Sequence, residues 1–324
     1  MTILITGGNG FVGQNLIKKL SQKKANKIIV LCRKKHKHLY FNIHKVKNLE
    51  VIYKADITNL KTIIKHFRGV DVVFNLAGFV SYKNADKKEL IKINYSGALN
   101  VLKACKHHKV KKLIHLSSSA ALGFSKQLID EEFRFDWSKH KRLNYSYSKH
   151  LAEASLLSSD TCVVVVSPPM IIGGGDEKIL PLVKIISEGK LKAIPEGRNS
   201  FVDVRDLADA MMFLMNKKMA SGRVLVAGGN HTNMELAEAI ATKLQTSPPK
   251  FVIPKFFGRL ICKIAIFIEA VFPNGKLNYE NVFLSFLDRR HSTKNIKKLG
   301  FCPKYSLDGS VSECVDYLKR ISLK

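Results

Sequence analysis

The sequence lacks both paired cysteines and any long apolar run. Its cysteines stand far apart, with no C-x-x-C pair and no metal-ligand spacing, at Cys32, Cys105, Cys162, Cys262, Cys302 and Cys314. Because this is not the spacing of a zinc site or a disulfide framework, we expect no metal and a reduced, cytoplasmic setting. No apolar run reaches the roughly 18 uninterrupted residues of a membrane span. The opening residues, MTILITGG, have the pattern of a buried strand, so we expect no secretory leader.

Acidic residues are also scarce. The 324 residues include 54 lysines and arginines but only 26 aspartates and glutamates, which gives a formal net charge of +28. Such a charge is typical of proteins that bind nucleic acid, anionic lipid or phosphorylated ligands. The lysines are scattered over the predicted surfaces, however, with no interleaved aromatics and no recognisable nucleic-acid module. We therefore expect no nucleic-acid partner and attribute most of the charge to the compositional habit of the source organism.

Internal repeats and low-complexity tracts are absent, and a regular alternation of strands and helices is present instead. Apolar strand patterns occur at residues 2–6, 27–32, 49–55, 70–78, 111–119 and 161–169, with helical patterns between them. Continuous apolar strands between helices indicate a parallel sheet that is covered on both faces. The predicted fold class is therefore α/β with a doubly wound parallel sheet.

A glycine-rich loop, ITGGNGFVG at residues 5–13, follows the first predicted strand and opens the first helix. Glycines there permit a tight turn and a close backbone approach to a pyrophosphate, which the free N–H groups and the dipole of the helix stabilise. Glycines also end strands for purely structural reasons. With a strand before it and a helix after it, the loop predicts dinucleotide binding through Gly7, Gly10, Phe11, Val12 and Gly13.

The alternation breaks after Pro169 and then resumes in part. Residues 201–215, FVDVRDLADAMMFLM, look like a return to the sheet through a short strand and a helix, and GRVLVAGG at residues 222–229 adds another strand. From about Asn230 the pattern is mainly helical. We predict a dinucleotide-binding domain and a smaller, mainly helical C-terminal substrate-binding domain, formed respectively by residues 1–166 with 199–229 and by residues 167–198 with 230–324.

The second predicted strand, KIIVLC, lacks a following acidic residue of the kind that hydrogen-bonds the adenosine ribose of NAD. Arg33 and Lys34 follow Cys32 instead. Guanidinium and ammonium groups pair with a ribose phosphate, so this stretch favours NADP, with NAD as the alternative. The other interpretation is that Arg33 and Lys34 only extend a solvated basic loop, RKKHKH at residues 33–38.

The stretch NYSYSKH, residues 144–150, holds two tyrosines and one lysine. Residues four apart on a helix share a face, so Tyr145 lies beside Lys149 whereas Tyr147 points elsewhere. An ammonium beside a phenol favours the phenolate and lowers a pKa that is ordinarily near ~10, which makes Tyr145 a usable general acid or base. The same spacing also occurs in ordinary pairs on helix surfaces.

Three serines end the strand pattern of residues 111–119, in HLSSSAALG. Open α/β sheets bind ligands at the carboxyl ends of their strands, so Ser117, Ser118 and Ser119 lie where a hydroxyl can hold a substrate oxygen near Tyr145. A polar strand end without a function is the alternative. The glycine loop, the serine strand and the tyrosine helix together bring the requirements of hydride chemistry to one edge of the sheet.

A series of motifs runs through the whole chain: TGGNGFVG, ADI at residues 55–57, DVVFNLAG, INYSGALNVLKAC, LIHLSSSA, YSYSK, SPPMIIGGGD, FVDVRDLADA and GFCPKYSLDGSV. Together they resemble the extended short-chain dehydrogenase/reductases of the NAD-dependent epimerase/dehydratase superfamily, which have a Rossmann domain. Arg33 is similar to the arginine of the dihydroflavonol-reductase-like and 3β-hydroxysteroid-dehydrogenase-like branches. The chain departs from the family at Ser167, where arginine is usual, and at Leu122, where tyrosine is usual.

The resemblance implies roles for individual residues. It makes Ser119 the substrate-orienting serine, Tyr145 the proton donor or acceptor, and Lys149 the residue that also binds the nicotinamide ribose. It further implies cofactor contacts at Asp56, Ile57, Ala77, Gly78 and Pro168, the last in the loop 167–170. Asn94 matches an asparagine of the central helix, for which an ordinary structural hydrogen-bonding role is the alternative.

The combined expectation is an NADPH-linked oxidoreductase that transfers hydride to or from a carbonyl or secondary alcohol, using Ser119, Tyr145 and Lys149. A nucleotide-sugar epimerase or dehydratase that reduces NAD transiently is the alternative within the family. A non-catalytic, dinucleotide-sensing protein is the alternative outside it, and the intact serine, tyrosine and lysine set argues against it. We expect a small-molecule substrate and a dimer.

One predicted helix, residues 255–272, combines basic and apolar residues. Lys255, Arg259 and Lys263 recur at four-residue intervals, and an apolar face contains Phe256, Leu260, Ile264, Phe267, Ile268 and Val271. A helix of this kind lies on an anionic membrane, walls a greasy pocket, or is an ordinary helix with its polar stripe in water. Peripheral membrane contact through residues 255–272 is therefore one of three open expectations.

Overall fold

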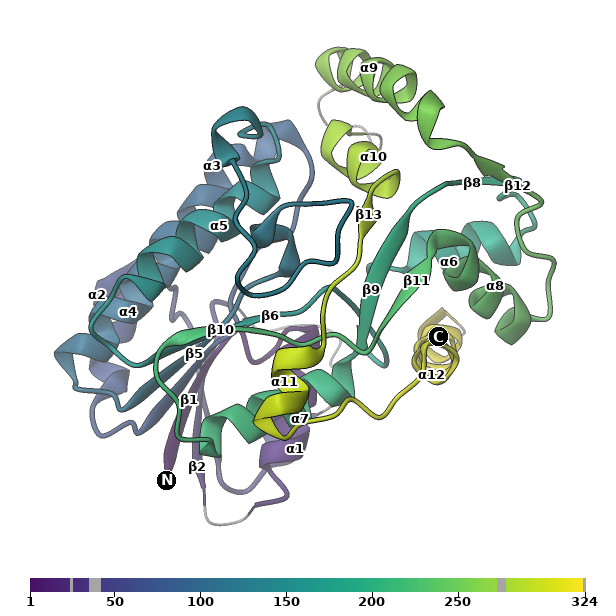
Figure 1. Ribbon diagram of the computed structural model, residues 1–324. Coiled ribbons are helices and arrows are strands. Elements are labelled where there is room, and N and C mark those ends of the chain that lie inside the picture. Colours follow the sequence, from purple (N-terminus) through teal and green to yellow (C-terminus); the bar gives the residue numbers. More distant parts are fainter. Residues whose placement is uncertain (24–25, 35–41, 273–277, 323–324) are drawn as a thin grey trace.

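A computed structural model describes residues 1–23, 26–34, 42–272 and 278–322. Its largest element is a sheet of seven parallel strands in the order β10, β6, β5, β4, β1, β2, β3 (Figure 1). These strands are β1 (Thr2–Thr6), β2 (Lys27–Leu31), β3 (Leu49–Ile52), β4 (Val72–Asn75), β5 (Lys112–Leu116), β6 (Val163–Ser167) and β10 (Gly222–Leu225). The chain order reverses between β1 and β4, which opens a crevice at the carboxyl ends of these strands. The predicted α/β class with a doubly wound parallel sheet is confirmed.

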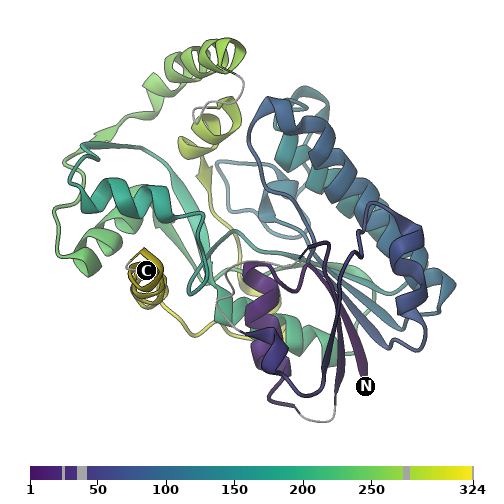
Figure 2. The same ribbon diagram turned by 180° about the vertical axis from the view of Figure 1, so that it is seen from behind.

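Helices cover both faces of this sheet (Figures 1 and 2). One face carries α1 (Phe11–Leu20), α7 (Val204–Asn216) and α11 (Lys294–Leu299), and the other carries α2 (Leu60–Ile63), α4 (Gly97–His107) and α5 (Asn144–Leu157). Ile3 and Ile5 of β1 enter the first of these two cores, whereas Leu4 enters the second. Because successive side chains alternate between two buried faces, the strands are apolar throughout.

A smaller lobe follows β6 and contains two further sheets. The four-stranded sheet consists of β7 (Met170–Ile172), β9 (Arg198–Asp203), β11 (Gly229–Thr232) and β13 (Asp288–Arg289), and the two-stranded sheet of β8 (Ala193–Pro195) and β12 (Phe251–Ile253). The helices of this lobe are α6 (Leu180–Ser187), α8 (Asn233–Leu244), α9 (Lys255–Val271), α10 (Tyr279–Ser285) and α12 (Leu307–Ser322). The expected smaller, mainly helical C-terminal part is therefore present.

The strand at residues 201–203 does not lie where the sequence pattern placed it. It belongs to β9, which pairs with β7, β11 and β13 and not with the large sheet. The chain returns to the large sheet only with α7. There, Asp209 of α7 forms a 2.8 Å ion pair with Lys19 of α1. The reason is that β9 serves two cores, since Phe201 packs in the small lobe while Val202 packs beneath the large sheet. The exact domain boundaries stay a prediction.

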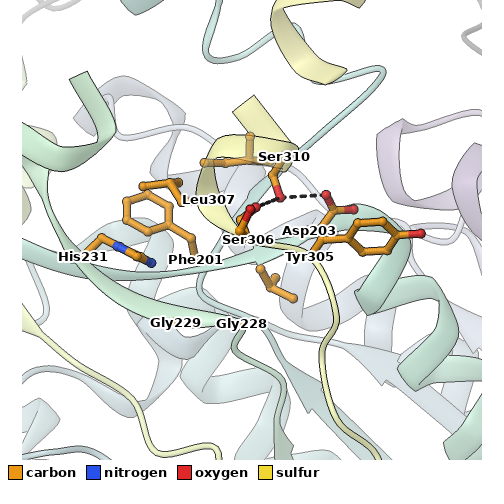
Figure 3. Close-up of a pocket in the computed structure, with 11 residues that line it drawn as sticks. Phe201, Asp203, Gly228, Gly229, His231, Tyr305, Ser306, Leu307 and Ser310 are labelled. Carbon is orange, nitrogen blue, oxygen red and sulfur yellow. Dashed lines mark hydrogen bonds between the residues drawn. The ribbon is translucent and has the colours of Figure 1, made fainter. Parts of the chain in front are cut away.

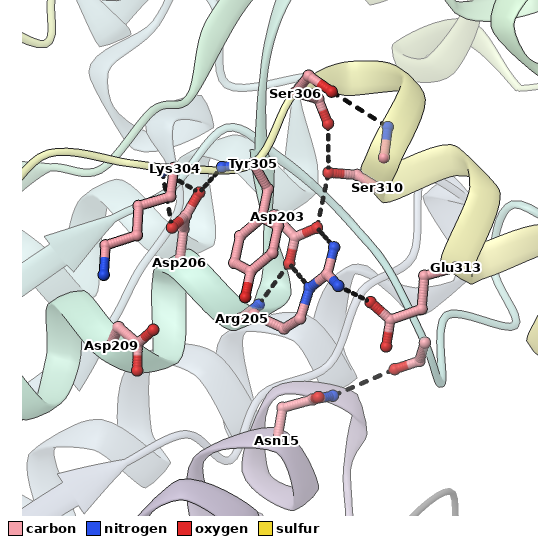
Figure 4. A network of polar contacts seen from close by, with 12 residues as sticks. Asn15, Asp203, Arg205, Asp206, Asp209, Lys304, Tyr305, Ser306, Ser310 and Glu313 are labelled. Atoms are coloured by element: carbon pink, nitrogen blue, oxygen red, sulfur yellow. Dashed lines mark hydrogen bonds and ion pairs between the residues drawn. The ribbon is translucent and has the colours of Figure 1, made fainter.

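The motif FVDVRDLADA fastens the C-terminal helix to α7 (Figure 4). Asp203 caps α7 by accepting a 2.7 Å bond from the Arg205 backbone, and it also accepts a 2.7 Å bond from the Ser310 hydroxyl in α12. Arg205 pairs with Asp203 at 2.6 Å and with Glu313 of α12 at 2.6 Å. Asp206 accepts backbone hydrogen bonds from the segment that leads into α12. The carboxylates of this motif therefore have a structural role, because they hold α12 and the segment before it against α7.

Candidate functional site

The glycine loop between β1 and α1 is as tight as a phosphate-binding turn requires. Gly7 has a φ of +68°, and a Cβ on it would lie 2.7 Å from the backbone nitrogen of Ala77. A Cβ on Gly13 would lie 2.4 Å from the carbonyl oxygen of Gly7. Neither position therefore accepts a side chain without a shift of the backbone. The loop directs the unpaired N–H groups at the start of α1 toward the carboxyl edge of the sheet.

A groove of about 230 Å³ lies beside this loop and follows the carboxyl ends of β1, β2 and β4. It collects seven of the predicted cofactor-binding residues: Gly7, Gly10, Arg33, Asp56, Ile57, Ala77 and Gly78. Five others, namely Phe11, Val12, Gly13, Lys149 and Pro168, do not line it. Val12 is instead buried against the large sheet, and Pro168 accepts a 2.8 Å hydrogen bond from the Ser119 backbone.

The end of the groove beside β2 contains the residues that are expected to bind the adenosine. Arg33 is exposed there, and the Asn9 amide donates a 2.9 Å hydrogen bond to the carbonyl oxygen of Lys34, which ties the glycine loop to the end of β2. The Asp56 carboxylate accepts a 2.9 Å bond from the Thr58 backbone, so part of it already supports the local turn. Residues 35–38 of the expected basic loop lie outside the described residues.

A layer of buried polar side chains supports the floor of the groove. Thr6, Asn75 and His115 are in register across the three central strands β1, β4 and β5. Thr6 donates to Asn75 at 2.6 Å, Asn75 donates to Nδ1 of His115 at 3.0 Å, and the Ala77 backbone donates to Thr6 at 3.2 Å. Burial holds the pKa of His115 well below its ordinary value, so the ring is neutral. The sequence prediction missed this layer, whose only signal was one polar residue in each of three apolar strands.

Helix α5 presents Tyr145 and Lys149 on one buried face, as the four-residue spacing predicts. Tyr145 is 7% exposed and packs edge-on against Tyr82, with ring centroids 5.6 Å apart. Tyr147 turns the other way and contacts Trp137 and His150. Helical periodicity alone therefore separated the two tyrosines correctly. Their roles in chemistry stay predictions.

The electrostatic relation between Tyr145 and Lys149 differs from the expectation. Burial raises the pKa of the Tyr145 phenol, with Tyr82 adding to the effect and a hydrogen bond with the Ser118 hydroxyl opposing it. The ammonium of Lys149 donates to the carbonyl oxygen of Leu116 at 3.1 Å, and burial lowers its pKa to about 8. The expected lowering of the phenol pKa is therefore wrong for this arrangement. Desolvation outweighs any effect of the ammonium, which points at the strand end.

The structure separates the three serines at the end of β5. Ser118 is half-buried; its hydroxyl accepts a 3.2 Å hydrogen bond from the Ala120 backbone and lowers the pKa of the Tyr145 phenol. Ser119 is buried at the start of a short 3₁₀ helix, where its backbone N–H donates to the Pro168 carbonyl oxygen at 2.8 Å. Ser117 is also buried, and its hydroxyl has no partner among the described residues. Which of the three serines contacts a substrate stays a prediction.

Asn94 links the groove to α5. It lies in a π-helical turn, residues 91–96, and is 2% exposed. Its side chain accepts from the Phe79 backbone at 2.8 Å, donates to the Phe79 carbonyl oxygen at 2.9 Å and donates to Ser148 at 2.9 Å. Ser148 donates in turn to the Tyr145 carbonyl oxygen at 2.7 Å. Asn94 therefore holds the loop after β4 and α5 in fixed register, which is the structural role weighed for it above.

The start of α5 is capped from the other end of the chain. No side chain near Leu143 caps the helix; instead Glu280 of α10 accepts bonds from the backbones of Tyr145 and Ser146, both at 3.1 Å, and from the Ser146 hydroxyl at 2.8 Å. A carboxylate at a helix N-terminus satisfies orphan N–H groups and complements the dipole. Glu280 thus joins the small lobe to α5, and no local sequence signal predicted this contact.

The buried carboxyl of Glu280 predicts a pH dependence of stability. Burial raises its pKa from 4.5 to about 7. As the pH rises from about 4.5 to about 7, the unfolded chain loses a proton that the folded chain keeps, so the free energy of unfolding falls. Glu280→Gln removes this titration. We expect wild type to lose about 1–3 kcal/mol more than the variant between about pH 5 and pH 7.5, measured by urea unfolding. If the free energies of unfolding of the two proteins change with pH in the same way, the Glu280 carboxyl does not cause the pH dependence.

A second buried carboxylate lies one turn beyond Lys149. Glu153 is fully buried, accepts a 2.7 Å bond from the Ser167 hydroxyl and pairs with Arg223 of β10 at 2.7 Å. Ser167 occupies the position where family members usually carry arginine. Arg223 reaches Glu153 from the neighbouring strand, because β10 lies directly beside β6 in the sheet. The departure at Ser167 is therefore accompanied by a guanidinium from another part of the sequence.

A separate cavity of about 150 Å³ lies in the small lobe, between β9, β11 and the start of α12 (Figure 3). Asp203, Ser306 and Ser310, which belong to the ties between α7 and α12, contribute to its wall. None of the predicted catalytic or cofactor-binding residues lines it. Within the described ranges, no group of three His, Cys, Asp or Glu side chains is arranged to hold a metal ion. The groove beside Gly7 is therefore the candidate site.

Comparisons with known proteins identify the family of the chain. Residues 3–228 match the family model for the NAD dependent epimerase/dehydratase family. Sterol demethylase protein B of Methylococcus capsulatus is 24% identical over 317 residues, which is 94% of each chain. Anthocyanidin reductase of Arabidopsis thaliana is 28% identical over 288 residues, 78% of this chain and 82% of that protein.

Among solved structures, the crystal structure of gox2253 superimposes with a TM-score of 0.84 and 21% identity, over 99% of this chain and 98% of that one. This likeness concerns the fold. The family model carries the assignment, because the 226 residues from 3 to 228 include every strand of the large sheet and the whole groove. The chain therefore belongs to the NAD-dependent epimerase/dehydratase family of enzymes.

Proposed function

We propose that the protein is an NADPH-dependent reductase or dehydrogenase that interconverts a carbonyl and a secondary alcohol in the reducing cytoplasm. The observation that supports it most is that α5 presents the buried phenol of Tyr145 and the buried ammonium of Lys149 on one face, beside the carboxyl edge of the sheet that also carries the groove. The similarity to a plant anthocyanidin reductase favours a reductase within this family. Six free cysteines agree with a reducing compartment.

In the proposed reaction, the nicotinamide supplies the hydride when it is bound. The serine hydroxyls at the end of β5 hold the substrate oxygen, and Tyr145 donates its phenolic proton to that oxygen and regains a proton from solvent. The raised pKa of Tyr145 suits this direction, because the phenol stays protonated and ready to donate at neutral pH. Lys149, whose pKa is about 8, contributes a cation near the nicotinamide end of the groove.

The preference for NADP over NAD rests on Arg33. Its exposed side chain lies at the groove end that follows β2, where an acidic residue would favour the unphosphorylated ribose. We expect Arg33→Asp to weaken NADP binding about 10- to 100-fold and to leave or improve NAD binding, because a charge-assisted bond to the phosphate is replaced by repulsion. Titration of both cofactors by intrinsic fluorescence measures this.

Arg68→Asp is the matched control for this prediction. Arg68 is also exposed, but it precedes β4 and therefore lies at the amino ends of the strands, whereas the groove lies at their carboxyl ends. The control makes the same change in net charge, so a similar loss of NADP affinity in both variants would mean that overall charge, and not Arg33, sets the preference. Unchanged NADP affinity in Arg33→Asp would contradict the cofactor proposal.

The function itself is tested by following NADPH absorbance with a panel of ketones, aldehydes and nucleotide sugars. Stoichiometric conversion of NADPH and a carbonyl to NADP and an alcohol supports the reductase. Interconversion of nucleotide sugars with no net change in NADPH would instead establish the epimerase or dehydratase alternative. Thermal shifts with NAD, NADP and their reduced forms identify the cofactor before the panel is run.

A further inference from the structure

Helix α9 is packed on one narrow face only. Of its 17 residues, only Gly258 and Ala265 are buried. Phe256 and Phe267 are 73% and 70% exposed. Further exposed apolar side chains on α9 and its flanks are Phe251, Val252, Phe257, Leu260, Ile264 and Val271. A set of this size is unusual on a globular surface, where large apolar patches mark contact sites.

The exposed surface of α9 is divided into two stripes. At 100° per residue, Lys255, Arg259 and Lys263 form one stripe, and the apolar residues from Phe256 to Val271 form an adjacent stripe about 100° wide. The remaining face packs against α10, and Gly258 lies there against Phe286. In Figure 1, α9 projects at the edge of the molecule, with α10 between it and the large sheet. The apolar stripe therefore faces away from the protein.

We propose that α9, together with β12, docks the protein on an anionic lipid bilayer. An apolar stripe beside a basic stripe is the arrangement of helices that lie in the membrane interface, with aromatic side chains in the acyl region and cations at the phosphates. Among the described helices, none is long and apolar enough to cross a membrane. The net charge of +28 attracts the protein to an anionic surface and opposes the pairing of two copies through this face.

The docking face is tied to the candidate site. Glu269, near the end of α9, accepts a 2.8 Å hydrogen bond from the backbone of Asn84. The Asn84 side chain accepts a 3.0 Å bond from Asn144, which directly precedes Tyr145. A bilayer beneath α9 would therefore lie close to the start of α5, the helix that carries Tyr145. This proximity favours a lipophilic substrate, an inference that rests on the proposed function. The docking itself does not depend on that function.

The experiment is co-flotation of the full chain with vesicles of equal parts phosphatidylglycerol and phosphatidylcholine, and with vesicles of phosphatidylcholine alone. We expect binding to the anionic vesicles to be at least about 10-fold stronger and to weaken with added salt. Phe256→Ser/Phe267→Ser and Arg259→Glu/Lys263→Glu are each expected to reduce binding at least about 10-fold. Retained thermal stability and NADPH binding show that these variants are folded.

Lys297→Glu/Lys298→Glu in α11 is the matched control, because it makes the same charge change on exposed lysines of another element. It is expected to keep most of the binding. An equal loss in this control would show that the overall charge is responsible, and unchanged binding of the phenylalanine variant would show that α9 does not insert; either result overturns the proposal. A wild-type dimer that becomes monomeric in the phenylalanine variant would overturn it too, by making α9 a contact between copies.

Discussion

Replacing Tyr145 with phenylalanine is expected to lower kcat/KM for carbonyl reduction by about 10²- to 10⁴-fold, while NADPH affinity changes by no more than about twofold. The substitution deletes one oxygen atom and with it the proton that the phenol donates to the substrate. The ring itself keeps its edge-on contact with Tyr82, so the packing of α5 is preserved. The effect should therefore fall on the chemical step. Steady-state kinetics with the best carbonyl of the panel, together with NADPH titration, measure both quantities.

Tyr147→Phe supplies the matched control on the same helix. Tyr147 is two residues away, and its ring contacts Trp137 and His150, contacts that phenylalanine also makes. We expect its kcat/KM to stay within about threefold of wild type. Removing the same atom at Tyr147 thus separates loss of a proton donor from a general disturbance of α5. Unaltered turnover in Tyr145→Phe, or a larger loss in Tyr147→Phe, would show that Tyr145 is not the acid.

Local patterns predicted the parts of the site whose geometry is local. Continuous apolar strands between helices predicted the sheet, and helical periodicity placed Tyr145 and Lys149 on one face without any knowledge of the fold. The glycine loop was predicted from its position between a strand and a helix that are adjacent in the chain, and the close contact of Gly13 with Gly7 lies within that loop. These features depend on residues within about one turn or one loop of each other.

Contacts made by distant parts of the chain were not predictable in this way. Glu280 caps α5 from 135 residues away, and its own surroundings read as an ordinary short helix. The direction of Lys149 was also missed, because it depends on the carbonyl of Leu116 at the end of another strand. The surroundings of the three serines were not predicted either, because the chain turns into a 3₁₀ helix at Ser119. Tertiary packing decides each of these, and a single sequence carries no signal for it.

The largest stability effect is expected from Arg223→Met. Among the described residues, this change leaves the carboxylate of Glu153, which is 0% exposed, with the Ser167 hydroxyl as its one remaining hydrogen-bond partner. Removing one partner of a buried ion pair typically costs about 3–5 kcal/mol, because the remaining charge cannot be hydrated. Methionine keeps most of the apolar stem of arginine, so lost packing contributes little. Urea unfolding of both proteins, with equal m-values, provides the difference in unfolding free energy.

Two further variants identify the cause of that loss. Glu153→Gln/Arg223→Met removes the stranded charge and is expected to recover more than half of the stability, which a loss of packing alone would not allow. Arg134→Met breaks an exposed pair with Glu132, whose side chains are 76% and 87% exposed, and should change stability by no more than about 0.5 kcal/mol. If the double variant is as unstable as Arg223→Met, burial of the Glu153 charge is not what makes Arg223 necessary. If it recovers, Arg223 is needed because it neutralises the buried Glu153 carboxylate on α5, the helix that carries Tyr145 and Lys149.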